Sequence, residues 1–572
     1  VSTNALSIFG DHSDVMAARQ TGFCMLAEGS VQEVMDLSAV AHLASIEGSL
    51  PFMNFFDGFR TSHELQKIEV LDYEDLKEMM PWEALENFRK RGMNPNHPTV
   101  SGTAQNPDIH FQQRETVNKY YDDMPAIVQK YMGKINELRG TNYDLVDYYG
   151  DPEATEVIIS MGSASPTIQQ TVAYLNAQGR KVGHINIHLY RPFPTENILA
   201  KLPKTVERIA VLDRTKEPGS DGEPLLLDVQ SILFRHENRP LVIGGRYGIA
   251  SKDVTPDQIV AVFDHLLLPV EQLKFRFTLG INDDVTHTNL PLLETLDLTP
   301  DSTFQAKFWG FGSDGTVGAN KQAIKIIGNH TDMYAQAYFA YDSKKSGGVT
   351  ISHLRFGHDP ILSTYNVEAA DYIACHNSAY IHEYDLLKGL KDGGTFLLNT
   401  VWDEEKVKQN LPNRLKKYIA QHDINFYIIN AMDISVKNGL GRRINTVCSA
   451  AFFEVTDIMD RETFLPLLKA EVDAAYGKKS RKIVENNWAA IDETFEALVK
   501  VAVPAEWAHI VLQEEVADDS DKPAYVKNIL EPINRQEGNA LSVGDLINNG
   551  MLGGEMPMGT AAYEKRGIAL EV

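Results

Sequence analysis

Cysteine is scarce in this sequence: 572 residues contain only Cys24, Cys375 and Cys448. The three lie far apart and match no CxxC or zinc-binding spacing. This excludes a disulfide scaffold, and it also excludes an iron–sulfur or zinc site built by this chain alone. Scattered single cysteines are typical of a reducing compartment inside the cell, so we expect a cytoplasmic protein.

Long apolar runs and positive charge are also lacking. No run of about 18 apolar residues occurs, and the amino-terminal stretch VSTNALSIFGDHSDV lacks the features of a secretory signal. We therefore expect no membrane span. Lys and Arg total 54 against 78 Asp and Glu, and the formal net charge of -24 argues against a general nucleic-acid binder. Any anion-binding site must be local.

The length and the rhythm of apolar runs predict several domains. At about 100 to 200 residues per domain the chain holds three or four. Short apolar runs alternate with helix-length segments, which predicts an α/β fold of several doubly wound βα domains. We place domains at residues 1–145, 146–300 and 301–508, with helices over 466–500 packed on the third. Residues 509–572, rich in Gly and Met towards the end, are predicted to form an extended connector.

One candidate loop follows a strand of the first domain. The apolar run 50–56 predicts a buried parallel strand, and the spacing of Thr61 and Glu64 predicts a capping box that starts a helix. Ligands of open α/β sheets bind at the carboxyl ends of strands. Asp57, Arg60, Thr61 and His63 are therefore candidates for lining a site or a subunit contact, although a turn and a helix cap explain the same residues.

A second candidate loop has the pattern Gly310-x-Gly312-x-x-Gly315 between a predicted strand and a helix from Val317 to about Ile327. Such a loop lets backbone N–H groups approach a phosphate at the helix N-terminus. Asp342 ends the next predicted strand, where a dinucleotide enzyme holds the ribose. This favours an NADP-dependent dehydrogenase. The alternative is that the glycines only permit tight turns.

Basic residues nearby favour an additional phosphate monoester, a group that NADP and coenzyme A both carry. Asp342 is followed by Ser343-Lys344-Lys345-Ser346, and Arg443 lies in the segment GRRIN, where its guanidinium suits a phosphate. Lysines and arginines on a solvated surface would explain the same pattern.

A thiamine diphosphate site is not encoded by the obvious triplets. The thiamine motif Gly-Asp-Gly is followed after about 25 to 30 residues by an Asn that helps to hold Mg²⁺. Here residues 219–222 and 312–315 both read GSDG, and neither has a well-placed Asn downstream. We therefore predict no metal site in this chain.

Longer motifs carry a resemblance to a known family. They run through nearly the whole chain and read ALSIFGDHSDVMAARQTGF, FFDGFRTSHELQKIEVLDY, GTAQNPDIHFQ, VLDRTKEPG, GRYGIASKD, FWGFGSDGTVGANKQAIKIIG, YDSKKSGGVTISHLRFG and TAAYEKRGIAL. In these motifs and their order the sequence resembles pyruvate:ferredoxin (flavodoxin) oxidoreductase.

The resemblance implies an oxidoreductase that decarboxylates pyruvate on thiamine diphosphate with Mg, passes electrons through 4Fe-4S clusters to ferredoxin or flavodoxin, and forms acetyl-coenzyme A. It implies thiamine-enzyme-like first and second domains, a Rossmann-like coenzyme A domain, and a homodimer in the cytoplasm or a hydrogenosome-type organelle. The implied contacts to coenzyme A are Gly312, Gly315, Lys321, Ser343, Lys344, Lys345, Ser346, Arg443 and Asn445.

The resemblance also implies that the chain is the central portion of a longer enzyme. Members of the family have further residues before and after the matching region, which hold most of the thiamine site and the cysteines of the clusters. We expect this chain alone to be inactive, to supply scaffold and the coenzyme A site, and to contain no assignable catalytic residue. Two alternatives to this oxidoreductase hypothesis stay open: the NADP-dependent dehydrogenase described above, and a coenzyme A-binding module without enzymatic activity.

Overall fold

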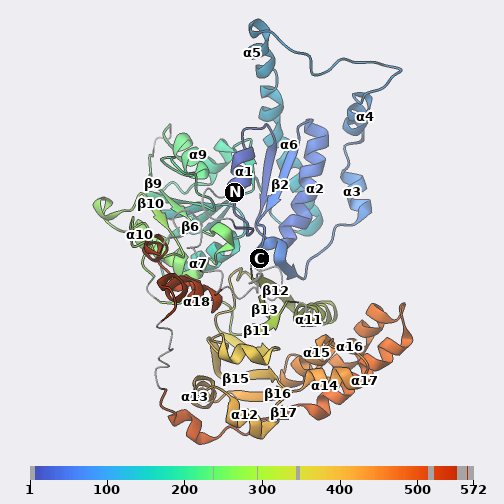
Figure 1. Cartoon of the computed structure of the whole chain (residues 1–572). Coiled ribbons are helices and arrows are strands. Elements are labelled where there is room, and N and C mark those ends of the chain that lie inside the picture. Colours follow the sequence, from blue (N-terminus) through green and yellow to red (C-terminus); the bar gives the residue numbers. More distant parts are fainter. Residues whose placement is uncertain are drawn as a thin grey trace.

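Three β-sheets organise the chain in the computed structural model (Figure 1). The structure describes residues 7–235, 238–292, 294–312, 314–342, 348–512 and 521–549, together with Gly559 and Tyr563. Each sheet contains parallel strands with helices against it, which confirms the predicted α/β fold class.

The first sheet has the order β2-β1-β7. Its strands are β1 (Cys24–Glu28), β2 (Phe52–Phe56) and β7 (Leu189–Arg191). β1 and β2 are parallel, as the run 50–56 predicts, but β2 is only half-buried. Helices α2 (Val31–Gly48) and α6 (Asn118–Arg139) pack against each other beside it. We call the parts of the structure that correspond to the predicted domains 1–145, 146–300 and 301–508 the first, second and third units. Because β7 comes from the second unit, the first two units share one hydrophobic core.

The predicted capping box at Thr61 and Glu64 is wrong. Thr61–His63 form a single 3-10 turn without a side-chain cap, and β3 (Glu64–Gln66) follows at once. β3 pairs antiparallel with β12 (Tyr334–Tyr341) of the third sheet. The backbone groups that a helix would need are used in this pairing.

The second sheet has the order β10-β9-β8-β5-β6-β4, and only β4 is antiparallel to its neighbour. Helices α7 and α10 belong to the core on one face, and α8 and α9 belong to the core shared with the first sheet. The elements are β4 (Val146–Gly150), β5 (Glu156–Ser160), α7 (Ser165–Ala177), β6 (Val182–Ile187), α8 (Thr195–Lys201), β8 (Arg208–Asp213), α9 (Pro224–Leu233), β9 (Leu241–Arg246), α10 (Pro256–Leu266) and β10 (Arg276–Thr278).

The third sheet has the order β17-β16-β15-β14-β11-β13-β12-β3, with a parallel centre of β16, β15, β14 and β11. Helices α11, α15, α16 and α17 pack on one face, and α12 and α13 pack near the other. The helices predicted over 466–500 are thereby confirmed. The elements are β11 (Phe304–Phe311), α11 (Thr316–His330), β13 (Val349–Gly357), β14 (Ala370–Cys375), β15 (Leu390–Asn399), α12 (Glu404–Asn410), α13 (Asn413–Gln421), β16 (Asn425–Ile429), α14 (Ala431–Lys437), α15 (Asn445–Val455), α16 (Arg461–Tyr476), α17 (Arg481–Ala497) and β17 (Val499–Lys500).

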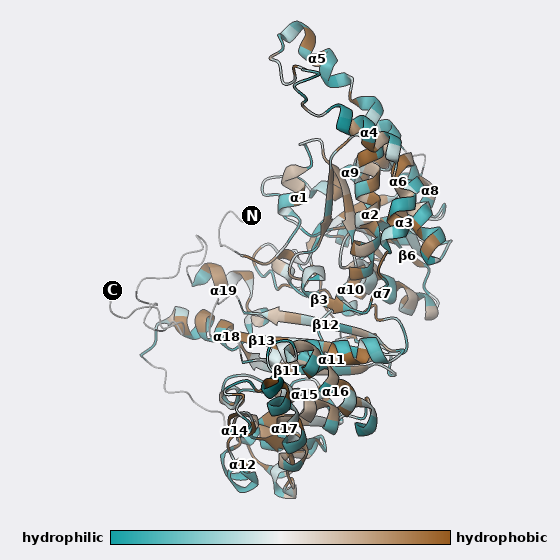
Figure 2. Ribbon diagram, turned by 90° about the vertical axis from the view of Figure 1, so that its right-hand side faces the viewer, coloured by the Kyte–Doolittle hydropathy of each residue, from teal (hydrophilic) through white to brown (hydrophobic). Residues whose placement is uncertain are grey.

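Two segments lie at the outside of this body. Helices α4 (Trp82–Lys90) and α5 (Pro107–Glu115) contain no buried residue and extend from the first unit (Figure 2). Part of the predicted connector is helical, with α18 (Glu531–Asn534) and α19 (Val543–Asn548) beside the second unit. Within the described ranges, no helix is both long and apolar enough to cross a membrane.

A buried arginine holds the third sheet to the loop that follows β13. Arg355 is 2% exposed, and its guanidinium donates to the side-chain oxygens of Gln305 and Gln336. It also donates to the backbone carbonyls of Ser363, Tyr365 and Asn366. Five acceptors therefore depend on one side chain.

We expect Arg355→Met to lower the free energy of unfolding by about 3 kcal/mol, because buried acceptors lose their donor while the apolar stem is kept. Denaturant unfolding followed by tryptophan fluorescence measures this change. The exposed Arg89→Met is the matched control and should leave the unfolding curve in place. A variant at Arg355 as stable as the control would contradict this role.

Candidate functional site

The glycine loop lies where the parallel strands of the third sheet end. It joins β11 to α11, as the sequence predicts, and its backbone is closed by Asp314. The N–H groups of Phe311 and Thr316 each donate to the Asp314 carboxylate over 2.7 Å. The N–H of Gly312 donates to the carbonyl of Gly348 over 3.1 Å. The loop is thus held at both ends before any ligand binds.

Two helix N-termini meet at Gly315. This residue has a φ of 102° and precedes α11, and a Cβ at its position would lie 3.2 Å from the Cβ of Asn445. Asn445 is the first residue of α15, which packs against α11. The N–H groups and dipoles of two helices therefore favour negative charge at the same place. The structure brings Gly315 and Asn445 together, and Gly312 lies in the same loop beside Gly348.

A buried polar chain runs beneath this loop, and sequence reasoning missed it. The Thr316 hydroxyl lies 2.8 Å from Nδ1 of His376, which directly follows β14. The Asn399 side chain donates to the carbonyl of His376 over 2.9 Å. Burial lowers the pKa of His376, although the charge of Asp314 opposes this shift. The signal was a His directly after an apolar strand, in DYIACHN.

The remaining predicted residues are placed differently. The Lys321 ammonium lies 5.7 Å from the ring centroid of Phe339, and its charge adds to burial in lowering the pKa of His63. Lys321 thus lies toward the first unit. Arg443 is exposed, and its carbonyl accepts from the Ser435 hydroxyl. Ser343, Lys344, Lys345 and Ser346 lie outside the described residues.

The strand order argues against the dinucleotide arrangement. In that fold the strand that ends at the acidic residue lies directly beside the strand before the glycine loop. Here β13 lies between β11 and β12 and is antiparallel to both. Asp342, which follows β12, is therefore two strands away from the strand that precedes the glycine loop. The geometry does not support the NADP prediction.

The other candidate loop is buried where the units meet. The Asp57 carboxylate accepts from Nε2 of His12 over 2.5 Å and pairs with Arg214 over 2.8 Å. It also accepts from the backbone N–H of Ser163 over 2.9 Å. Burial opposes ionisation, but Arg214 and His12 hold the pKa of Asp57 well below its usual range. Asp57 is thus a structural anchor between the first two units.

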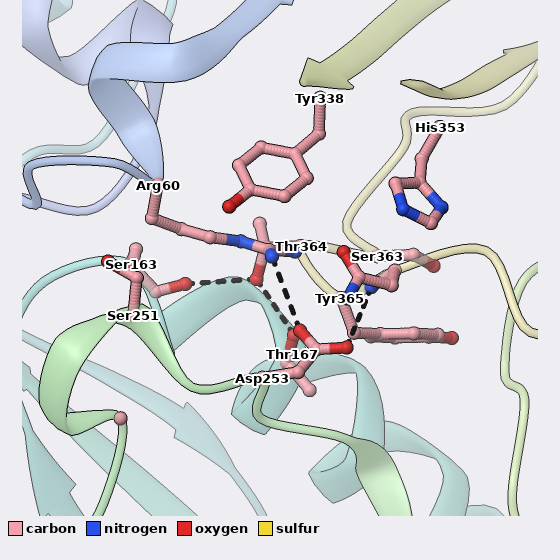
Figure 3. Close-up of polar contacts among 12 residues, drawn as sticks. Arg60, Ser163, Thr167, Ser251, Asp253, Tyr338, His353, Ser363, Thr364 and Tyr365 are labelled. Carbon is pink, nitrogen blue, oxygen red and sulfur yellow. Dashed lines mark hydrogen bonds and ion pairs between the residues drawn. The ribbon is translucent and has the colours of Figure 1, made fainter. Parts of the chain in front are cut away.

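Arg60 extends the same junction to the third unit (Figure 3). Its guanidinium lies 3.2 Å from Asp253 of the second unit and 4.2 Å from the ring centroid of Tyr338. The Thr364 hydroxyl of the third unit lies 2.8 Å from the Thr167 hydroxyl of the second unit, within hydrogen-bond distance. It also donates to the carbonyl of Ser163 (Figure 3). These contacts favour the structural interpretation of the loop over a catalytic one.

Fold and site define a multi-sheet α/β protein with a glycine loop at converging helix N-termini. Comparisons with known proteins identify its family. Family models match residues 1–133 (pyruvate flavodoxin/ferredoxin oxidoreductase, thiamine diP-bdg), 154–259 (pyruvate:ferredoxin oxidoreductase core domain II) and 305–497 (pyruvate ferredoxin/flavodoxin oxidoreductase). A domain of unknown function matches 512–569. The chain belongs to the pyruvate:ferredoxin (flavodoxin) oxidoreductase family.

Individual relatives agree along the whole chain. A pyruvate-flavodoxin oxidoreductase of Enterobacter agglomerans is 54% identical, and a pyruvate:ferredoxin oxidoreductase of Moorella thermoacetica is 52% identical. Each match covers 100% of this chain and 48% of the relative. A pyruvate dehydrogenase (NADP(+)) of Cryptosporidium parvum is 44% identical over 100% of this chain and 31% of the relative. The chain thus spans about half the length of the first two relatives.

The Asp57 cluster predicts a specific acid sensitivity. Because the pKa of Asp57 is depressed in the folded state, its contribution is present above the ordinary Asp pKa of about 4 and is lost as the pH falls below it. We expect Asp57→Asn to cost about 3 kcal/mol at neutral pH and less with each step into acid. Thermal unfolding of both proteins across this range measures the difference.

The exposed Asp122→Asn serves as the control for this comparison. A constant difference between wild type and Asp57→Asn from neutral to acid pH would show that Asp57 does not act through its charge.

Proposed function

We propose that this chain is part of a pyruvate:ferredoxin (flavodoxin) oxidoreductase and supplies its coenzyme A site. The complete enzyme oxidatively decarboxylates pyruvate to acetyl-coenzyme A and CO₂ and passes electrons singly to ferredoxin or flavodoxin. The observation that carries the coenzyme A assignment is the meeting of α11 and α15 at Gly315 and Asn445. Family membership selects this ligand among phosphate-bearing cofactors.

The loop chemistry suggests how the phosphates are held. Asp314 already accepts the N–H groups of Phe311 and Thr316, so these two backbone donors are not available to a phosphate. We therefore assign the main phosphate contacts to side chains around the loop: Asn445, the exposed Arg443, and the pair Lys344 and Lys345. One neighbour of the lysine segment supports this, because the carbonyl of Gly348 accepts from the N–H of Gly312 in the loop. Ser343 and Ser346 add hydroxyl donors, and Lys321 lies on the side toward the first unit.

The described residues contain no cluster that would hold the metal or the iron–sulfur clusters of the family by themselves. Thiamine diphosphate needs Mg²⁺ held by oxygen ligands, and the described ranges contain no group of three or more His, Cys, Asp or Glu placed to hold a metal. The three cysteines are free and buried in separate places. Because the family model described as thiamine-diphosphate-binding matches residues 1–133, we propose that this chain contributes part of the thiamine site, and that Mg²⁺ and the clusters are held mainly by segments outside it.

The partners follow from the same assignment. Pyruvate, coenzyme A, ferredoxin or flavodoxin and the remaining parts of the enzyme are the expected ones, in a homodimer in the cytoplasm or a hydrogenosome-type organelle. The proposed division of labour leaves this chain inactive alone. A module that binds coenzyme A without enzymatic activity would share the site but would copurify with no thiamine-bearing partner.

Calorimetric titration with coenzyme A tests the site. We expect saturable binding that is about tenfold weaker in Lys344→Ala/Lys345→Ala and in Asn445→Ala, because each change removes phosphate contacts. The matched control is Lys478→Ala/Lys479→Ala, an exposed lysine pair in the same unit that should leave binding unchanged.

NADP is titrated in parallel to separate the two phosphate-bearing ligands. Two results would contradict the assignment: an affinity for coenzyme A that is the same in the site variants and in wild type, or saturable binding of NADP with no binding of coenzyme A.

A further inference from the structure

A cavity with the features of an anion site lies in the second unit. It has a volume of about 310 Å³, within the range of small-ligand pockets. Residues Arg246 and Thr278, the last residues of β9 and β10, line it. It therefore lies at the carboxyl edge of this sheet, where open α/β sheets bind ligands. The proposed coenzyme A site is on a different sheet, so neither site depends on the other.

Three cations line this cavity. The Arg246 guanidinium forms an ion pair with the buried carboxylate of Glu223, at a distance of 3.2 Å. The charge of Arg246 is thereby neutralised within the protein. Lys252 donates to the side-chain oxygen of Asn539 over 2.8 Å and has its pKa lowered by burial. Lys216 is exposed, and within the described ranges it forms no ion pair. Two ammonium groups thus lack a carboxylate.

One carboxylate in the lining, Asp283, offsets part of this charge. Asp283 is 4% exposed and accepts from the N–H and hydroxyl groups of Thr286 and Thr288. Burial opposes ionisation of Asp283, but these hydrogen bonds lower its pKa. Asp283 is therefore ionised. With Arg246 paired to Glu223, it offsets one of the two remaining cations, and the cavity keeps an excess of one positive charge.

The rest of the lining is apolar and open. Ile249, Ile281 and Ile547 are between 38% and 40% exposed although they line a concave surface. Ile547 belongs to α19, which is fixed over the second unit because the Asp284 carboxylate accepts from Ser542 and Gly544. Figure 1 shows the helices of this carboxyl-terminal segment beside β10 and α10. An aliphatic group would cover this exposed apolar surface.

We propose that this cavity binds a short aliphatic carboxylate as a small-molecule ligand. The carboxylate contacts Lys216 and Lys252, and the aliphatic chain lies on Ile249, Ile281 and Ile547. A neutral ligand would leave both ammonium groups unpaired. An inorganic anion would leave the apolar wall exposed.

Hexanoate is the probe, and its binding to the purified protein is measured by calorimetry and by saturation-transfer NMR. We expect saturable binding that is about tenfold weaker in Lys216→Met, because a charged hydrogen bond is lost while the stem is kept. Lys252→Met should weaken binding similarly. The exposed Lys204→Met in the same unit is the matched control, and the melting temperature of each variant reports folding.

Hexanol has the aliphatic chain of hexanoate without its charge, and inorganic phosphate has negative charge without an aliphatic chain. Titrating both therefore tests the two parts of the ligand separately. Weak binding of both, compared with hexanoate, supports the proposal. Three results would overturn it: no saturable hexanoate binding, hexanoate binding unchanged in Lys216→Met, or hexanol or phosphate binding as tightly as hexanoate. None of them affects the coenzyme A assignment, which concerns the third unit.

Discussion

The buried carboxylate of Asp57 is the constraint on which the arrangement of the units depends. It follows β2 of the first unit and is held by His12, by Arg214 after β8, and by Ser163 after β5. A buried charge that loses its partners costs several kcal/mol, so these segments cannot separate without a large penalty. The strand β7, which pairs with β1, binds the same two units through backbone hydrogen bonds.

The third unit is fixed by the continuation of the same loop. The carbonyl of Phe59 accepts the Tyr338 hydroxyl over 2.8 Å, Arg60 lies over the Tyr338 ring, and β3 adds a strand to the third sheet. Because β3 attaches at β12, the glycine loop two strands further along lies near the junction. Lys321 beside His63 marks this proximity. The loop of Asp57 and Arg60 thus sets the position of the third unit.

The local elements of the glycine loop could be predicted from sequence, because a strand, a glycine run and a helix follow each other directly. The position of β13 between β11 and β12 could not, since strand order depends on contacts distant in sequence. The capping box failed for a related reason: the spacing of Thr61 and Glu64 is local, but the pairing of β3 with β12 overrides it. His376 was missed because its polar chain is assembled from the ends of β14 and β15 and the start of α11, which are far apart in the sequence. The role of the Lys344–Lys345 pair stays a prediction.

The central claim is that coenzyme A binds where α11 and α15 begin, and amide hydrogen exchange tests it most directly. The exchange of residues 310–318 and 443–448 is compared with and without saturating coenzyme A. If coenzyme A binds there, exchange slows in both segments and is unchanged in the second unit, around β9 and β10. Protection that appears only in the second unit, or in neither segment while coenzyme A binds, would contradict it.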